Sequence, residues 1–109
     1  MDAELKERLT RWHKQIDSVA DASRTYLDLE ASEKPLYSQL FLSSEGKSIA
    51  EREARPYASD AWRDFTKGLV IAKTEYNRQM HTLELKKKAF DAAYLTAKLE
   101  NDGLKRPQN

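Results

Sequence analysis

One position of this 109-residue chain recurs every seven residues along its second half without an exception. Its members are Trp62, Leu69, Tyr76, Leu83, Phe90, Ala97 and Leu104. Two turns of an α-helix take about seven residues, so this repeat places all of these apolar side chains on one helix face. Gln79 and Lys86 interrupt the companion position, which is otherwise filled by the apolar residues Phe65, Ala72 and Ala93. A chain with this pattern must bury a long helical stripe against another helix.

The first half of the chain has a comparable stripe, with spacings that follow a four-three series. Its apolar members are Leu5, Leu9, Trp12, Ile16, Val19, Tyr26, Tyr37 and Leu40. The stripe becomes polar near Ser32, which suits the start of a new helix with Pro35 in its first turn. Either one helix kinked near Pro35 or two helices almost in line would satisfy this pattern, and we favour the kink.

The strongest turn signals lie between the two stripes. Gly46 suits the left-handed residue that follows a helix end. Ser48 and Glu51 have the spacing of a capping box, in which the two side chains satisfy backbone N–H groups at a helix start. Pro56 lacks an N–H and restricts the residue before it, so we expect the short helix to end there.

These signals predict a single all-α domain over residues 1–109, because this length is usual for one domain. The expected parts are a first long helix over 1–44, a turn and short helix over 45–55, a second long helix over 56–102 and a flexible tail over 103–109. Two long helices joined by a short connection should form an antiparallel, coiled-coil-like hairpin. We expect such a hairpin to be able to dimerise into a helical bundle.

Composition restricts the compartment and the class of protein. The chain has 19 basic and 18 acidic residues and no cysteine. It has no apolar run of the roughly 20 residues that a membrane crossing needs. The N-terminal segment also lacks the apolar core of a signal peptide, so we expect a cytoplasmic protein without membrane contact.

Residues that could support catalysis are sparse. His13 and His81 stand in no metal-binding motif, and the Gly-Lys-Ser within residues 44–48 lacks the first glycine of a phosphate-binding loop. Glu30 and Glu33 are a candidate acid–base pair only if they are buried, and the kink favours solvent exposure instead. We therefore expect no enzyme, with no catalytic, metal or cofactor site and no small-molecule substrate.

Apolar residues off the two stripes indicate a docking function instead. They are Leu27, Leu29, Leu36, Phe41, Val70, Ile71, Leu95 and Leu99. Exposed patches of this kind usually mark association surfaces, although they can also widen the contact within the hairpin. The sequence predicts a protein-protein interaction module, with a homodimer or another protein as the partner. Its expected anchors are four aromatic residues of the second long helix, namely Trp62, Phe65, Tyr76 and Phe90.

Direct nucleic-acid binding is the alternative function. The cations that would contact a phosphate backbone are Lys47, Arg52, Arg55, Lys73, Lys86, Lys87 and Lys88. Binding to a phosphate backbone requires several cations on one face of the helix. Three consecutive lysines instead point in different directions around a helical turn. Protein docking therefore remains the preferred function.

Residues 45–53 read Glu-Gly-Lys-Ser-Ile-Ala-Glu-Arg-Glu, between a leucine- and tyrosine-rich helix and a long charged one. This segment resembles the E-G-K-[ST]-x-x-E-R turn of small helical accessory proteins of tailed bacteriophages, which are often encoded near single-strand-annealing recombination genes. Glu53 and Pro56 depart from that pattern. The resemblance implies two helices around a turn and an accessory protein in the host cytoplasm. It further implies action on a DNA recombination or host-defence component.

Overall fold

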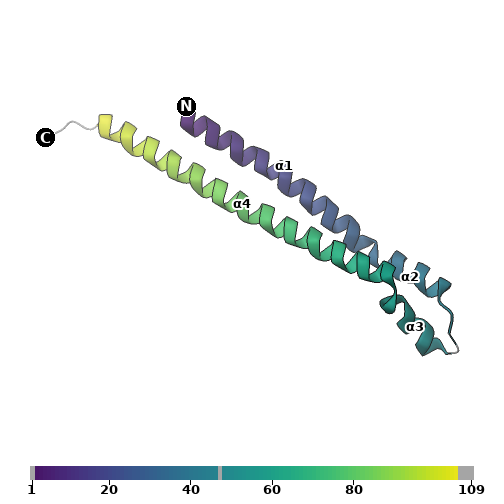
Figure 1. Ribbon diagram of the computed structural model, residues 1–109. Coiled ribbons are helices and arrows are strands. Elements are labelled where there is room, and N and C mark those ends of the chain that lie inside the picture. Colours follow the sequence, from purple (N-terminus) through teal and green to yellow (C-terminus); the bar gives the residue numbers. More distant parts are fainter. Residues whose placement is uncertain (1, 47, 106–109) are drawn as a thin grey trace. The chain divides into compact units, whose positions relative to one another are not determined.

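A computed structural model describes residues 2–46 and 48–105 of the chain, with side chains to residue 102 (Figure 1). Its helices are α1 (Ala3–Ala31), α2 (Glu33–Ser43), α3 (Ile49–Ala58) and α4 (Asp60–Lys105). No strand occurs within the described ranges. The predicted all-α fold is therefore confirmed.

The chain divides into two compact units, each of which pairs part of α1 with part of α4. Unit 1 comprises residues 1–20 and 77–109, and unit 2 comprises residues 21–76. In unit 1 the ring centres of Trp12 and Phe90 lie 5.5 Å apart. In unit 2 those of Tyr26 and Tyr76 lie 6.1 Å apart. The two long helices therefore pair along the predicted stripes, as in a helical hairpin.

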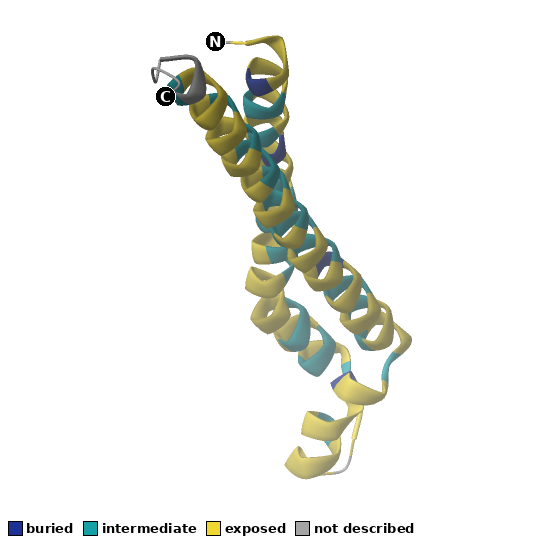
Figure 2. Ribbon diagram, turned by 90° about the vertical axis from the view of Figure 1, so that its left-hand side faces the viewer, coloured by how far each residue is buried: buried dark blue, intermediate teal, exposed yellow. Residues whose placement is uncertain are grey.

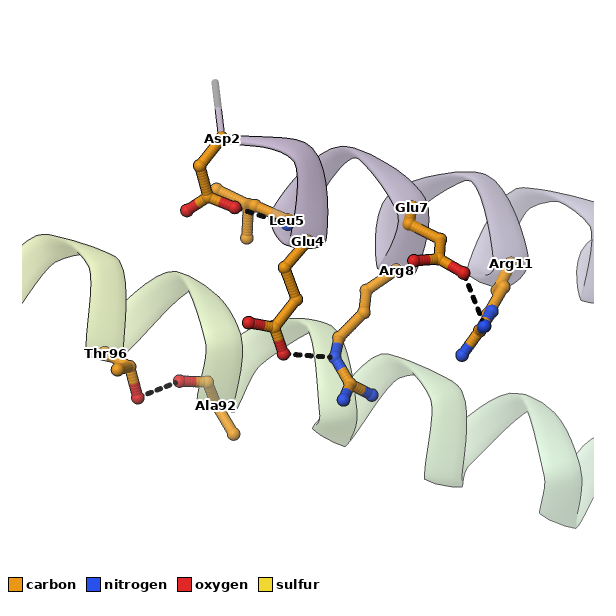
Figure 3. Close-up of polar contacts among 8 residues, drawn as sticks. All are labelled: Asp2, Glu4, Leu5, Glu7, Arg8, Arg11, Ala92 and Thr96. Carbon is orange, nitrogen blue, oxygen red and sulfur yellow. Dashed lines mark hydrogen bonds and ion pairs between the residues drawn. The ribbon is translucent and has the colours of Figure 1, made fainter.

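In unit 1 the start of α1 is fixed by local polar contacts (Figure 3). The backbone N–H of Leu5 donates a hydrogen bond of 2.8 Å to the Asp2 carboxylate, which caps the helix. Arg8 then pairs with Glu4 one turn earlier, at 3.4 Å. These contacts hold the buried Leu5 side chain, which is 8% exposed, where α1 begins.

Each unit has a small interior (Figure 2). In the part of the chain that the structure describes, the buried residues are Leu5 and Gln15 in unit 1 and Pro56 and Ala72 in unit 2. Two paired helices bury only one stripe each, so the opposite faces remain in water. Large apolar side chains consequently stay exposed on both units.

The break in the first helical tract falls at Ser32, three residues before Pro35. Pro35 has no N–H to donate to the carbonyl of Ala31, and its ring crowds that carbonyl. Ser32 keeps a helical backbone, and its hydroxyl donates to the Asp28 carbonyl at 2.8 Å instead of capping α2. The predicted helix over 1–44 is thus divided into α1 and α2, and its expected cap is not formed.

Of the two predictions for the turn, the helix cap at Ser48 is confirmed and the left-handed conformation of Gly46 is wrong. The Ser48 hydroxyl accepts a hydrogen bond from the Glu51 backbone N–H at 3.2 Å, so Ser48 caps α3 as predicted. Gly46 does not adopt the expected left-handed conformation. Space at Gly46 is tight, because a Cβ there would lie 3.0 Å from Cγ of Arg52 and 3.3 Å from its backbone nitrogen, so these neighbours would have to shift slightly.

The predicted boundary at Pro56 is wrong. Pro56 lies inside α3, and the second long helix begins at Asp60. Ser59 forms the junction, because its N–H and hydroxyl donate to the Pro56 carbonyl at 3.2 and 2.7 Å. Its hydroxyl oxygen also accepts the Trp62 N–H at 3.1 Å, which caps α4. Of the expected tail, residues 103–105 belong to α4, and residues 106–109 lie outside the described ranges.

Replacing Ser59 with alanine is expected to lower the free energy of unfolding by about 1 kcal/mol, because it removes this cap. Chemical denaturation followed by circular dichroism measures the change. Ser59→Asp should retain most of the stability, because a carboxylate accepts the same N–H bond. Equal stability of the wild type and Ser59→Ala would show that the cap adds nothing.

Candidate docking surfaces

An aromatic cluster joins α2, α3 and α4 in unit 2. Trp62 stands at its centre, with Tyr37 and Tyr57 edge-on at 6.2 and 5.2 Å and Phe65 at 5.6 Å between ring centres. The Tyr37 hydroxyl donates to the Glu53 carbonyl of α3 at 3.0 Å. Partial burial raises the pKa of Tyr37, and the neighbouring Tyr57 and Glu53 add to this effect. The cluster therefore fixes the short helices on the start of α4.

A groove opens beside this cluster, with a volume of about 610 Å³. We call it the α3–α4 groove, and its lining residues are Tyr57, Trp62, Arg63, Thr66, Lys67, Val70 and Ile71. The outer side chains are open to solvent, since Val70 is 60% and Ile71 69% exposed. An apolar groove of two to three helical turns suits the apolar face of a partner helix.

Two cations border the α3–α4 groove. Arg63 lies 3.5 Å from the Asp60 carboxylate, in a pair that water surrounds. Lys67 makes no ion pair with any described residue. Both positive side chains line the groove, so it combines an apolar floor with a basic rim.

The four predicted anchors are half-buried within the chain. Trp62 and Phe65 pack in the aromatic cluster, and Phe90 packs on Trp12. Tyr76 packs on Tyr26, whose pKa is raised by a hydrogen bond to the Glu30 carboxylate and then by partial desolvation. Among the four anchors, Trp62 is the one that also lines the α3–α4 groove.

The predicted nucleic-acid contacts have different surroundings. The Arg52 guanidinium lies over the Phe41 ring at 5.4 Å, and Arg55 lies 3.8 Å from the Glu51 carboxylate. Lys86 is half-buried. Lys73, Lys87 and Lys88 are exposed, and Lys47 lies outside the described residues. Arg52 and Lys86 therefore contribute to packing within their own units.

Lys86 takes part in a polar layer inside unit 1. Gln15 is 4% exposed, and its amide donates to the Gln79 carbonyl and side-chain oxygen at 2.9 and 2.7 Å. The Lys86 ammonium donates to the Gln15 side-chain oxygen at 3.1 Å. The sequence indicated this layer through Gln79 and Lys86, which interrupt the apolar companion position of the second stripe. It did not indicate that Gln15 would be their buried partner.

A second, solvent-facing stripe runs along the unit 1 part of α4. It begins at His81 and continues with spacings of four and three through Leu85, Lys88, Ala92, Leu95 and Leu99. We call these six residues the outer stripe. Its leucines are 53%, 56% and 62% exposed in chain order. The sequence indicated Leu95 and Leu99, and the same spacing rule would have found Leu85.

The remaining chemical candidates are solvent-exposed side chains. His13, His81, Glu30 and Glu33 are all exposed, so the carboxylates lack the burial that acid–base work was expected to need. Among the described residues, no group of three or more His, Asp or Glu side chains could hold a metal ion. None of the helices in the described ranges combines the length and apolar character that a membrane crossing requires.

Comparison with known proteins gave no match to a family model, a curated protein or a solved structure.

Proposed function

We propose that this protein is a non-enzymatic interaction module that binds an acidic amphipathic helix of another protein in its α3–α4 groove. The observation that carries the proposal is the combination of an apolar floor, with Val70 and Ile71 exposed, and the cations Arg63 and Lys67. Leucines of the partner helix would occupy the floor, and its carboxylates would lie against the cations.

Charge complementarity favours an acidic helix as the partner in the α3–α4 groove. A basic helix would bring its own cations against Lys67, which has no ion-pair partner among the described residues. A second copy of the groove would also place Arg63 and Lys67 against like charges. An acidic helix removes both conflicts, and Trp62 at the groove wall provides a large apolar anchor.

The resemblance of the turn to that of bacteriophage accessory proteins extends this proposal to the identity of the partner. In that setting the acidic helix belongs to a recombination or host-defence protein in the host cytoplasm. The support is the turn sequence over residues 45–52.

Fluorescence titration with synthetic peptides tests the proposed function. The chain has two tryptophans, so Trp12→Phe leaves Trp62 as the sole reporter. One peptide carries leucines at helical spacing with glutamates on the other faces, and its control carries lysines instead. We expect the acidic peptide to shift Trp62 emission and to bind roughly tenfold more tightly than the basic one.

Matched variants locate the binding. Lys67→Glu should bring the affinities of the two peptides close together, whereas Lys73→Glu, on the same helix outside the groove lining, should leave the ratio unchanged. Equal binding of both peptides, or an unchanged Trp62 spectrum, would refute the proposal. Binding of a short single-stranded oligonucleotide that salt abolishes would support the nucleic-acid alternative instead.

A further inference from the structure

The outer stripe of α4 belongs to unit 1, which has a small interior. Its three leucines do not pack inside the unit and remain exposed to solvent. Within the described part of unit 1, Leu5 and Gln15 are the buried residues. Leu85, Leu95 and Leu99 meanwhile remain more than half exposed at coiled-coil spacing. Repeats of this kind over about three heptads are typical of a helix that pairs with another helix.

We propose that the outer stripe pairs with the outer stripe of a second copy of this chain, with the two α4 segments antiparallel. In this register Leu85 lies opposite Leu95 of the second copy, and Leu95 lies opposite its Leu85. Lys88 lies opposite Ala92, a small residue that leaves room for the lysine stem while its ammonium extends outward. His81 lies opposite Leu99 at each end.

The charges beside the stripe select the antiparallel direction. Glu84, Asp91 and Lys98 follow one another every seven residues along one flank of the outer stripe. An antiparallel pair places Glu84 of each copy near Lys98 of the other. The two Asp91 carboxylates then face each other at the centre, where each lies near a Lys88 ammonium. A parallel pair would place Glu84 and Asp91 beside Ala89 and Thr96 on the opposite flank of the second copy, so the pairs between Glu84 and Lys98 would not form.

The other flank holds the small side chains of Thr82, Ala89 and Thr96, and Ala89 and Thr96 line a hollow together with Glu4 and Arg8 of α1. The register is also selected by the leucines. A shift by one heptad would place Leu85 opposite the carboxylate of Asp102 and would separate the leucine pairs. The proposed register therefore joins Leu85 with Leu95 and Glu84 with Lys98 at both ends of the contact.

This inference is independent of the proposed function. It concerns unit 1, whereas the α3–α4 groove belongs to unit 2. Failure of either proposal leaves the other intact, because the two are tested with different variants and different measurements.

Sedimentation equilibrium tests the dimer. We expect twice the chain mass of 12.6 kDa for the wild type across the micromolar range. Leu95→Glu should weaken dimerisation at least roughly tenfold, with the helical content retained because the side chain is exposed. The matched control is Leu27→Glu, since Leu27 is 55% exposed on α1 and has one cation and one acid at helical spacing. A monomeric wild type, or a Leu95→Glu variant that dimerises fully, would refute the proposal.

Crosslinking tests the register, because the chain has no native cysteine. The double variant Glu84→Cys/Lys98→Cys should form a covalent dimer with a short bis-maleimide reagent. The two cysteines of one chain are about 21 Å apart along the helix, which prevents crosslinking within a chain. Neither single variant should crosslink, because the same residue in the two copies lies at least about 18 Å apart in this register. Dimers from the single variants, or none from the double variant, would refute the antiparallel register.

Discussion

Replacing Ala72 with aspartate is expected to lower the free energy of unfolding by about 3 kcal/mol. Ala72 is 7% exposed on the face of α4 that carries the predicted stripe. An aspartate there forces a carboxylate into a closely packed contact without a prepared partner. Urea denaturation followed by circular dichroism at 222 nm measures the loss.

The neighbouring position provides the matched control. Ile71 is 69% exposed, so Ile71→Asp should change the free energy of unfolding by no more than about 0.5 kcal/mol. The same variant should bind the acidic peptide weakly, because the groove then presents a carboxylate. Equal stability of Ala72→Asp and Ile71→Asp would contradict the assignment of the buried face.

Replacing Gln15 with leucine is expected to destabilise unit 1 by about 2 kcal/mol. Gln15 is 4% exposed, and its side chain contacts both Gln79 and Lys86. Leucine retains the volume but removes two donated bonds and the acceptor of the Lys86 ammonium. The loss is measured by urea denaturation followed by circular dichroism at 222 nm.

A second variant separates polar pairing from packing. Gln15→Glu should lose less stability than Gln15→Leu, because a carboxylate still accepts from the Lys86 ammonium. If Gln15→Leu proves as stable as the wild type, the layer contributes no net stability. Its contribution would then be limited to fixing the register of the two helices.

Helix content and the pairing face were readable from the sequence because they depend on local spacing. The stripe from Trp62 to Phe90 packs where the repeat placed it, with Phe90 on Trp12 and Tyr76 on Tyr26. Capping by Ser48 was equally readable, since it involves residues three positions apart. These features need no knowledge of distant contacts.

Helix boundaries were less predictable because they depend on competing local effects. Pro56 was expected to end α3, yet the helix continues through it and Pro56 becomes fully buried. Burial of the proline ring compensates for the missing backbone hydrogen bond. Ser59 then ends one helix and caps the next, a double role that spacing alone did not reveal.

The candidate sites were predictable only in part. The aromatic anchors were predicted to bind a partner, and in the structure Trp62 and Phe65 contact the chain's own aromatic cluster. The α3–α4 groove requires Tyr57 from α3 to stand beside Trp62 and Ile71 from α4, which sequence spacing cannot show. Similarly, the sequence predicted Lys86 as a phosphate contact, whereas its ammonium donates a hydrogen bond to Gln15.

The sequence by itself determined that the chain is helical and which face of each long helix packs inward, because a seven-residue repeat depends on backbone geometry alone. Only the tertiary structure decided where Gln15 and Lys86 meet and which apolar side chains stay in water. Those outcomes depend on contacts between residues far apart in the chain, such as Gln15 with Gln79. The free energy of burial is set by such neighbours, and a linear pattern does not contain them.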